Sequence, residues 1–241
     1  MVVEVHEVLK RIKAQSPEHA SGAQAVAELV ASLQREGRLP ERLPLEDEWK
    51  KQAGALASLF AKELDMKEED YINSLPKLTL PPENRRDGLG GFVMVETRIK
   101  PRRQCQLADI HYFIYEPPLG EISDWSDGSE GDRTPNTPYL TWYKDIGGIL
   151  NKDVLQVRAS LKPEERGGTV FDGIALFIAG SPVLKNYDLF LPGTQYFAGP
   201  PRSKEEHAVH QGLDREGHKV IEASAIGSAL PNFGHLVCLR N

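Results

Sequence analysis

Three histidines late in the sequence have the residue type, and part of the spacing, that a metal site needs. His207 and His210 are three residues apart, and His218 follows eight residues after His210. Histidines three residues apart lie on one face of a helix, and imidazole is a good ligand for zinc or iron. The segment lacks the glutamate of the H-E-x-x-H pattern, and its polar composition is typical of an exposed loop. We therefore expect loop histidines, no metal and no other cofactor, with a His207/His210/His218 group as the alternative.

The two cysteines of the chain are the candidate nucleophiles. Cys105 lies in the segment PRRQCQ, beside two arginines that could lower the pKa of its thiol, and His111 follows as a candidate base. Cys238 lies in the apolar segment HLVCLR, which is typical of a buried structural cysteine. The sequence contains no G-x-S-x-G nucleophile elbow. A hydrolase-like enzyme that uses Cys105 or the histidine group is therefore the alternative function, and a non-enzymatic binding protein is the leading one.

Residues 138–145 are rich in aromatic side chains and could contribute to a ligand site. In a strand, Tyr139 and Tyr143 lie on one face and Trp142 lies on the other. One face is expected to pack in the core, and the other could contact a ligand or a partner. Charged residues further along the chain complete the set. The candidate ligand-binding residues are Tyr139, Trp142, Arg158 and Asp172.

The segment from Val170 to Ala179 is predicted to be a helix buried at the centre of the second half. Its residues are apolar on nearly all sides, which is typical of a buried helix. Thr169 and Asp172 fit a capping box at its start, and Gly180 fits its end. The helix dipole favours a negative charge in the first turn. We therefore expect the Asp172 carboxylate to be structural first and ligand-facing second, and Asp172→Asn to cost little stability.

Loops that bind phosphate or calcium are not indicated by the sequence. The GLGG run at residues 88–91 leads into a strand pattern and not into a helix, and no G-x-x-x-x-G-K-[ST] motif occurs. The acidic run DWSDGSEGD does not place acids at the ligand positions of a calcium loop. These patterns argue against a nucleotide-dependent enzyme and against a calcium sensor.

Residues 1–74 are predicted to form a helical N-terminal region, because apolar side chains recur there at three- and four-residue spacing. Helices are expected near the start of the chain, from Ser16 to Gly37, from Asp47 to Leu64 and from Lys67 to Ser74. We expect these helices to form a bundle or cap that packs on the remaining chain, with a domain boundary near residue 75.

Residues 75–241 are predicted to form an α+β domain, because short β-branched and aromatic runs do not alternate regularly with helices. A mixed, mainly antiparallel sheet region with one central buried helix fits this pattern. Strands are expected at residues 77–80, 91–99, 110–115, 139–146, 154–160, 189–191, 219–225 and 236–239. Loops are expected at residues 117–138 and 197–214. The acidic stretch 119–137 is predicted to be mobile, since its few apolar residues do not offset the entropy of ordering it.

Composition and charge limit the partners and the compartment. The chain has 241 residues, a formal net charge of -6 and a pI near 5.7, which argues against nucleic acid as a partner. No stretch reaches the roughly 18 apolar residues of a membrane span, and two cysteines are too few for a disulfide scaffold. We expect a cytoplasmic protein that binds a protein or a small molecule, without a nucleic-acid or membrane partner. An oligomeric structural module is a further alternative, and the oligomeric state is left open.

Several segments together carry a resemblance to a known family. The segments TPYLTWYKDIG, ERGGTVFDGIALFIAGSPVL, YDLFLPGT and ALPNFGHLVC are similar to those of an uncharacterised bacterial family, a domain of unknown function. The resemblance covers about residues 75–241. It implies a bacterial origin and an intracellular setting, and it implies no activity and no functional residue.

Overall fold

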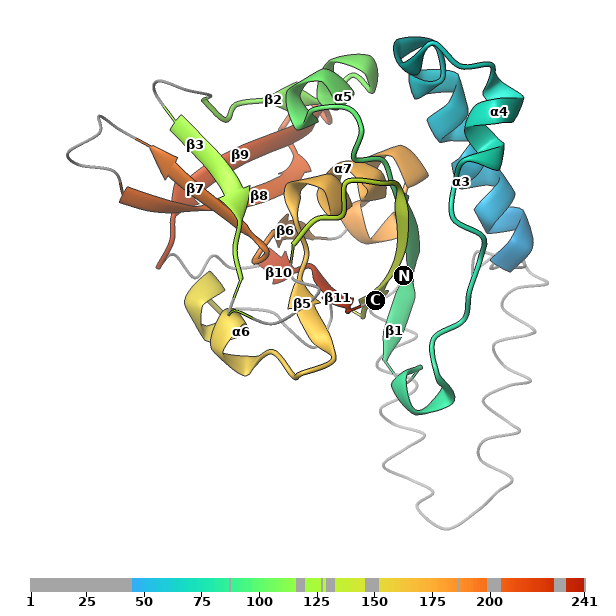
Figure 1. Cartoon of the computed structure of the whole chain (residues 1–241). Helices are drawn as coiled ribbons and strands as arrows, with labels where there is room; N and C mark the ends of the chain where they lie inside the picture. Colours follow the sequence, from blue (N-terminus) through green and yellow to red (C-terminus); the bar gives the residue numbers. More distant parts are fainter. Residues whose placement is uncertain are drawn as a thin grey trace, which may run out of the picture. The chain divides into compact units, whose positions relative to one another are not determined.

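The computed structural model describes most of the chain after residue 44 (Figure 1). The described residues are 45–86, 88–115, 120–126, 128, 133–145, 152–185, 187–198, 205–227 and 233–240. The chain divides into two compact units, Met1–Leu45 and Glu46–Asn241. The two helices expected before residue 45 therefore lie outside the described residues. Within the second unit, the helices before residue 75 share a core with the strands, as expected for helices that pack on the remaining chain, and the boundary near residue 75 stays a prediction.

Two helices cover one side of this shared core. They are α3 (Leu45–Phe60) and α4 (Glu68–Asn73), joined by a 3-10 turn at Lys62–Leu64, and they confirm the helices expected at 47–64 and 67–74. Leu56 and Phe60 of α3 and Tyr71 of α4 are buried in one cluster with Phe92 and Met94. The apolar stripe read from the sequence is thus the face that packs on the strands.

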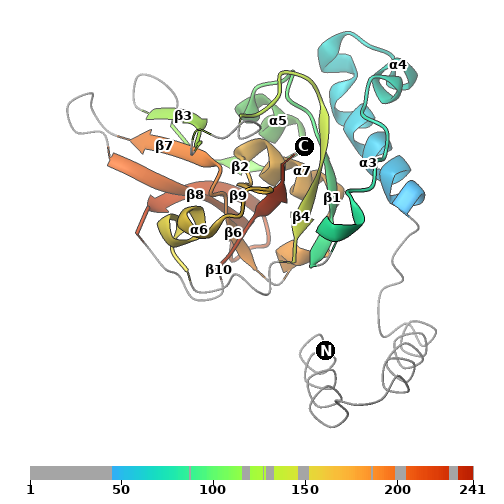
Figure 2. The ribbon, with the colours of Figure 1, turned by 60° about the horizontal axis from the view of Figure 1, so that its bottom comes forward.

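The first sheet has four strands in the order β1 (Leu89–Val95), β4 (Tyr139–Lys144), β11 (Val237–Leu239) and β5 (Glu165–Gly167), all antiparallel. Side chains alternate between the two faces of a strand. Phe92 and Met94 point toward α3, whereas Val93 and Val95 pack against α7 (Val170–Ala179). Figure 2 shows α3 and α7 on opposite sides of β1 and β4.

The second sheet has seven strands built around β8 (Glu205–Leu213). β8 pairs antiparallel with β6 (Asp188–Phe190), β7 (Thr194–Ala198) and β9 (Lys219–Ala225). β3 (Gly120–Asp124) pairs antiparallel with β7, while β2 (His111–Tyr112) and β10 (Phe233–His235) pair parallel with β9 and β6. Both sheets are therefore mainly antiparallel, and the α+β class is confirmed.

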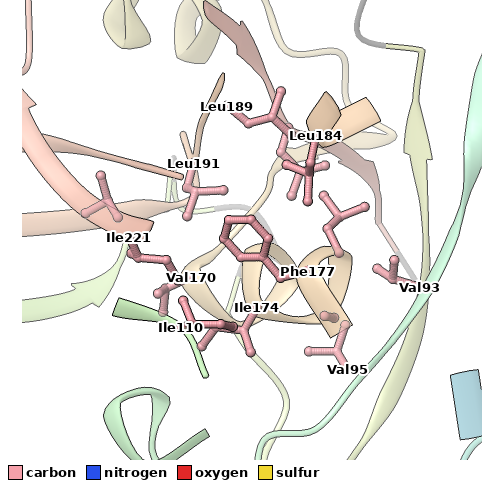
Figure 3. Close-up of a cluster of buried hydrophobic side chains, with 14 of the residues drawn as sticks. Val93, Val95, Ile110, Val170, Ile174, Phe177, Leu184, Leu189, Leu191 and Ile221 are labelled. Carbon is pink, nitrogen blue, oxygen red and sulfur yellow. The ribbon is translucent and has the colours of Figure 1, made fainter. Parts of the chain in front are cut away.

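The helix α7 lies between the two sheets and fills the larger core. Figure 3 shows Phe177 among side chains of the first sheet, such as Val93, and of the second, such as Leu189 and Ile221. Thr169 accepts a hydrogen bond from the backbone of Asp172 in a capping box, and Gly180 ends the helix in the left-handed conformation at φ 65°. The predicted bounds, caps and burial of this helix are all confirmed.

The segment 154–160 is a helix, α6 (Val154–Ser160), and the strand expected there is wrong. Asp153 caps it, because its carboxylate accepts the Gln156 N–H while the Gln156 side chain accepts the Asp153 N–H. Val154 and Val157 are buried at helical spacing. The strand expected at 77–80 is also wrong; there the Trp49 and Trp142 indoles donate to the carbonyls of Pro76 and Thr79.

The two stretches expected to be loops contain strands. β3 lies inside the acidic stretch 119–137, and its end is tied down because Asp124 accepts hydrogen bonds from the Thr134 N–H at 2.7 Å and hydroxyl at 3.0 Å. Next to it, the Trp125 N–H donates to the Gly193 carbonyl. The loop expected there is therefore partly a strand, while the mobility of the stretch stays a prediction, and positions 119, 127 and 129–132 lie outside the described part. β7 and β8 occupy most of 197–214.

The remaining helix before β2 is α5 (Pro101–Leu107), which contacts β2 and α7. Within the part of the chain that the structure describes, no helix combines the length and apolar character that crossing a membrane requires.

Candidate functional site

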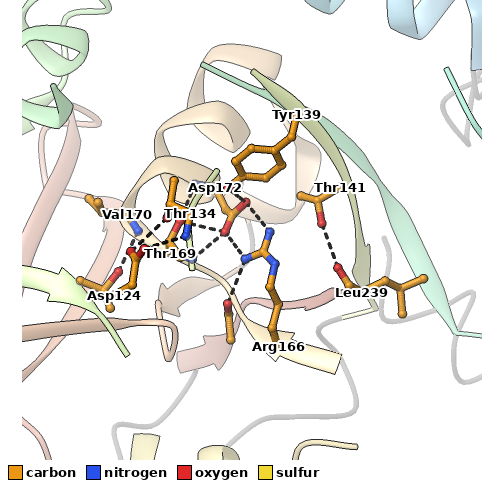
Figure 4. Close-up of polar contacts among 11 residues, drawn as sticks. Asp124, Thr134, Tyr139, Thr141, Arg166, Thr169, Val170, Asp172 and Leu239 are labelled. Atoms are coloured by element: carbon orange, nitrogen blue, oxygen red, sulfur yellow. Dashed lines mark hydrogen bonds and ion pairs between the residues drawn. The ribbon is translucent and has the colours of Figure 1, made fainter. Parts of the chain in front are cut away.

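Two of the four predicted ligand residues meet in the core, where they form a cluster with Arg166 of β5 (Figure 4). The Tyr139 hydroxyl donates to Asp172 Oδ1 at 2.8 Å. Arg166 donates to both oxygens of the same carboxylate, from Nη1 to Oδ2 at 2.7 Å and from Nη2 to Oδ1 at 3.0 Å. The Arg166 guanidinium also lies over the Tyr139 ring, 5.5 Å from its centroid. We call Tyr139, Arg166 and Asp172 the inner cluster.

The inner cluster is closed to solvent and fully paired. Burial alone would raise the pKa of Asp172, but the Arg166 charge and the hydrogen bonds from Arg166, Thr169 and Tyr139 hold it below its ordinary value. Burial, followed by the charge of Asp172, raises the pKa of the Tyr139 phenol. The Thr169 N–H donates to Asp172 Oδ2 at 2.6 Å, so the same carboxylate also caps α7. These contacts join β4, β5 and α7 and leave no face of Asp172 open to a ligand.

This geometry corrects the expected cost of replacing Asp172. The side chain is completely buried, and Arg166 beside it is only 6% exposed. An asparagine would leave a buried guanidinium without a counter-charge, which is strongly destabilising. The contacts of Asp172 agree with the structural role that we expected for it in preference to ligand binding. They do not agree with the expectation that Asp172→Asn would cost little stability.

Arg158, the third predicted residue, holds the turn between β6 and β7. Its guanidinium donates to the carbonyls of Pro192 at 2.8 Å and Thr194 at 3.0 Å, and to Glu206 Oε1 at 2.7 Å. It also lies over the Trp125 ring at 4.9 Å. Burial lowers the pKa of Arg158, although Glu206 opposes the shift. The Arg158 side chain thus has a structural role, and it does not lie beside Tyr139 and Asp172.

Trp142, the fourth predicted residue, lies on the other face of β4. The expected separation of faces is confirmed, because Tyr139 and Tyr143 belong to the core around α7 while Trp142 packs with the cluster under α3. Its ring lies 5.2 Å from that of Phe92. The structure therefore distributes the four predicted ligand residues over three places.

The two cysteines are buried, which argues against the alternative in which Cys105 is a reactive thiol. Burial raises the pKa of Cys105 to about 12, and the charge of Arg102 opposes this only in part. Burial and the nearby Asp172 charge also raise the pKa of Cys238 to about 12. A thiol that stays protonated is a poor nucleophile, so neither cysteine has the environment that a catalytic cysteine needs.

The three predicted histidines do not form one group. His207 and His210 lie on β8 and not on a helix or in a loop, so three-residue spacing places them on opposite faces. His210 packs edge-on against both Phe190 and Phe233, and burial lowers its pKa to about 4. His218 lies apart from both, directly before the first residue of β9.

His218 meets two other possible metal ligands, His111 and Asp214. One ligand atom from each of the three residues lies within 4.8 Å of the others. His218 Nδ1 lies 3.0 Å from Asp214 Oδ2, and this hydrogen bond raises the pKa of His218. The sequence contained no signal for His111 in this group, because the approach depends on parallel pairing of β2 with β9.

A cavity of about 450 Å³ lies where α6 meets the ends of β4, β5 and β11. One part of its wall is apolar, and the rest carries charges of both signs together with Ser160. The apolar residues are Val157, Leu161 and Val237, and the charged residues are Lys144, Asp145, Lys152 and Glu165. Asp145, Lys152 and Ser160 are exposed, so the cavity opens to solvent. Sequence reasoning missed it because α6 was expected to be a strand.

Comparison with protein-family models, with curated proteins and with solved structures finds no match to this chain. The resemblance of residues 75–241 to an uncharacterised bacterial family therefore stays a prediction.

Proposed function

We propose that the protein is a cytoplasmic, non-enzymatic binding protein that holds a small molecule in the cavity between α6 and the four-stranded sheet. The observation that carries this proposal is the cavity itself. Its volume of about 450 Å³ lies within the range of small-molecule sites. It also combines an apolar wall with a few charged groups, which is the usual make-up of such sites.

The charges on the cavity wall favour a ligand that carries both a carboxylate and an ammonium group. Lys144 Nζ lies 3.5 Å from Glu165 Oε1, so a cation and an anion stand side by side on one wall. Lys152 and Asp145 add a second charge of each sign. A zwitterion can pair with both signs, whereas a dianion or a diamine would face a like charge. Since charge pairs near solvent contribute little free energy, we expect Val157, Leu161 and Val237 to supply affinity and the charges to supply orientation.

The chemistry of the cavity residues supports binding without turnover. Its described lining includes no cysteine and no histidine. The Ser160 hydroxyl donates to the Val157 carbonyl of its own helix and is not paired with a base. A hydroxyl nucleophile needs an adjacent general base. The overall negative charge further supports a small molecule or a protein, and not nucleic acid, as the partner.

The proposal is tested by thermal melting of the full chain with a panel of zwitterionic amino acids of increasing side-chain size, beside diamines and dicarboxylates. At one hundred times its Kd a ligand stabilises the folded state by about 2.7 kcal/mol, which melting resolves. We expect some zwitterions to raise Tm and to be recovered chemically unchanged. No shift from any zwitterion, or conversion of the ligand detected by mass spectrometry, would overturn the proposal.

Two neighbouring residues of α6 give a matched pair of variants. Ser160 lines the cavity, whereas the adjacent Ala159 is exposed and does not line it. Ser160→Phe should fill the mouth of the cavity and abolish the ligand-induced shift. Ala159→Phe should keep it. An equal shift in both variants would place the ligand elsewhere.

A further inference from the structure

We propose that His111, Asp214 and His218 form a binding site for a divalent transition-metal ion, with Zn²⁺ as the ion that suits the donors best. The three side chains supply two imidazole nitrogens and one carboxylate oxygen, and these atoms lie within 4.8 Å of one another. Zinc is commonly bound by this combination of ligands. The site shares no residue with the cavity beside α6, so it goes beyond the proposed ligand function.

The fold brings these residues together from two distant segments. His111 begins β2, whose parallel pairing with β9 sets His111 opposite Val220. Asp214 and His218 flank the turn between β8 and β9, and the Asp214 N–H donates to the His218 carbonyl at 2.9 Å. His218 is thus two residues before the point where β9 meets His111. The contact between the rings, with centroids 5.1 Å apart, follows from this register.

Asp214 is held in place by the turn that it closes. Its Oδ1 accepts hydrogen bonds from the backbone N–H groups of Glu216 at 2.9 Å and His218 at 2.8 Å. Its Oδ2 faces the imidazole, 3.0 Å from His218 Nδ1. One oxygen therefore fixes the carboxylate while the other points toward the position where a metal ion would bind. A ligand ordered in advance loses less entropy on binding.

The distances require only a modest closing of the three side chains. Tetrahedral zinc with bonds of about 2.0–2.2 Å holds its ligand atoms about 3.3–3.5 Å apart. His111 and His218 are both exposed, so their rings can rotate into this geometry without displacing core residues. The Phe113 ring packs edge-on against His111 at 6.0 Å and limits that ring on one side. Three protein ligands would leave a fourth position for water or another molecule.

The neighbouring charge also favours a cation. Glu216 Oε2 lies 3.5 Å from His218 Nδ1, and the Asp109 carboxylate acts on the same imidazole. A metal ion bound between Asp214 and His218 would replace the proton of the hydrogen bond between them, and that proton would be released to the solvent. Glu216 and Asp109 therefore add to the negative potential that Asp214 creates at the metal position.

The experiment is calorimetric titration of ZnCl₂ into the chelator-treated full chain. We expect one zinc ion per chain, and affinity weakened by more than about tenfold in His111→Ala and in His218→Ala. His207→Ala is the matched control, because His207 lies on the same sheet outside the site and should bind zinc as the wild type does. Thermal melts without metal check that all variants fold.

A second measurement uses the link that the metal makes between β2 and the β8–β9 turn. Zinc should raise Tm in the wild type and in His207→Ala but not in the two site variants. Failure of the wild type to bind stoichiometric zinc, or unchanged affinity in His111→Ala and His218→Ala, would overturn the proposal. Neither outcome depends on whether the cavity binds a zwitterion.

Discussion

Two clusters in this molecule use the same three contacts in different surroundings. In the inner cluster, Tyr139 donates to Asp172, and Arg166 pairs with that carboxylate and lies over the tyrosine ring. In the outer cluster, which consists of Tyr71, Glu96 and Arg98, the Tyr71 hydroxyl donates to Glu96 Oε2 at 2.7 Å. Arg98 donates to both Glu96 oxygens, at 2.9 and 2.6 Å, and lies 5.1 Å from the Tyr71 ring centroid. The contacts match almost one for one.

The two clusters differ in the exposure of the cation. Both carboxylates are completely buried, but the Arg166 side chain is 6% exposed and the Arg98 side chain is 25% exposed. If its carboxylate is removed, Arg98 can turn toward water, whereas Arg166 has no such route. The comparison teaches that burial of the partner left behind, and not the pattern of hydrogen bonds, decides how much each acid contributes to stability.

Removal of the arginine should have the largest effect and should not distinguish the clusters. Arg166→Met and Arg98→Met each leave a buried carboxylate without its counter-charge, so we expect each to lose about 3–5 kcal/mol of unfolding free energy in urea titrations. The isolated acid then has a raised pKa, so each deficit should shrink as pH falls.

The exposed pair Arg103–Glu63 provides the control for this series. Arg103 donates to both Glu63 oxygens at 2.9 and 2.7 Å, yet both side chains are well exposed. Arg103→Met should leave stability nearly unchanged. A loss in Arg103→Met as large as that in Arg166→Met would break the argument from burial.

An acid titration separates the clusters from a third buried group, His210. Burial holds its pKa at about 4, against 6.5 in the unfolded chain, so the unfolded state takes up the proton first. The unfolding free energy should therefore fall by about 2 kcal/mol between pH 6.5 and about 5. Asp172 and Glu96 stay charged in the folded protein over this range, because the pKa of each is lowered. His210→Gln should flatten this slope, and His235, whose pKa is also lowered by burial, should keep part of it. An unchanged slope in His210→Gln would contradict the assignment.

Removal of the tyrosine hydroxyl should cost less stability than removal of the arginine of the same cluster. Tyr139→Phe and Tyr71→Phe each delete one hydrogen bond to a charged carboxylate that keeps its arginine and a backbone donor. We expect losses of about 1.5–3 kcal/mol at most, measured by thermal and urea unfolding. Tyr139→Phe should be the more costly, because Arg166, which shares its carboxylate, is less exposed than Arg98. A larger loss in Tyr71→Phe would reverse the order that burial predicts.

Local signals in the sequence predicted some elements to the residue and missed others. The bounds of α7 were predicted correctly because Thr169, Asp172 and Gly180 are strong capping signals next to an apolar run. The α6 segment was misread because its valines suit a strand as well as a helix, and the caps at Asp153 and Gln156 decide between them. β8 was missed because its polar residues resemble a loop, and pairing with three other strands holds it in the sheet.

The candidate sites were less predictable, because each depends on contacts between distant segments. Tyr139 and Asp172 were predicted as ligand-binding residues, and their contact with each other, their pairing with Arg166 and their burial follow from the packing of α7 on the first sheet. No metal was expected, and the alternative histidine group placed His218 with His207 and His210, which do not lie beside it. Its neighbours His111 and Asp214 are set by the pairing of β2 with β9 and by the turn at Asp214.

The most direct test of the role of burial is the difference in unfolding free energy between Asp172→Asn and Glu96→Gln, measured in one urea series at pH 7. We predict a loss of about 3–5 kcal/mol for Asp172→Asn, because Arg166 stays buried without a partner, and a loss smaller by about 2 kcal/mol for Glu96→Gln. Equal losses would show that exposure of the cation does not matter. An Asp172→Asn protein as stable as the wild type would contradict the account, and would return Asp172 to the candidate ligand-binding residues.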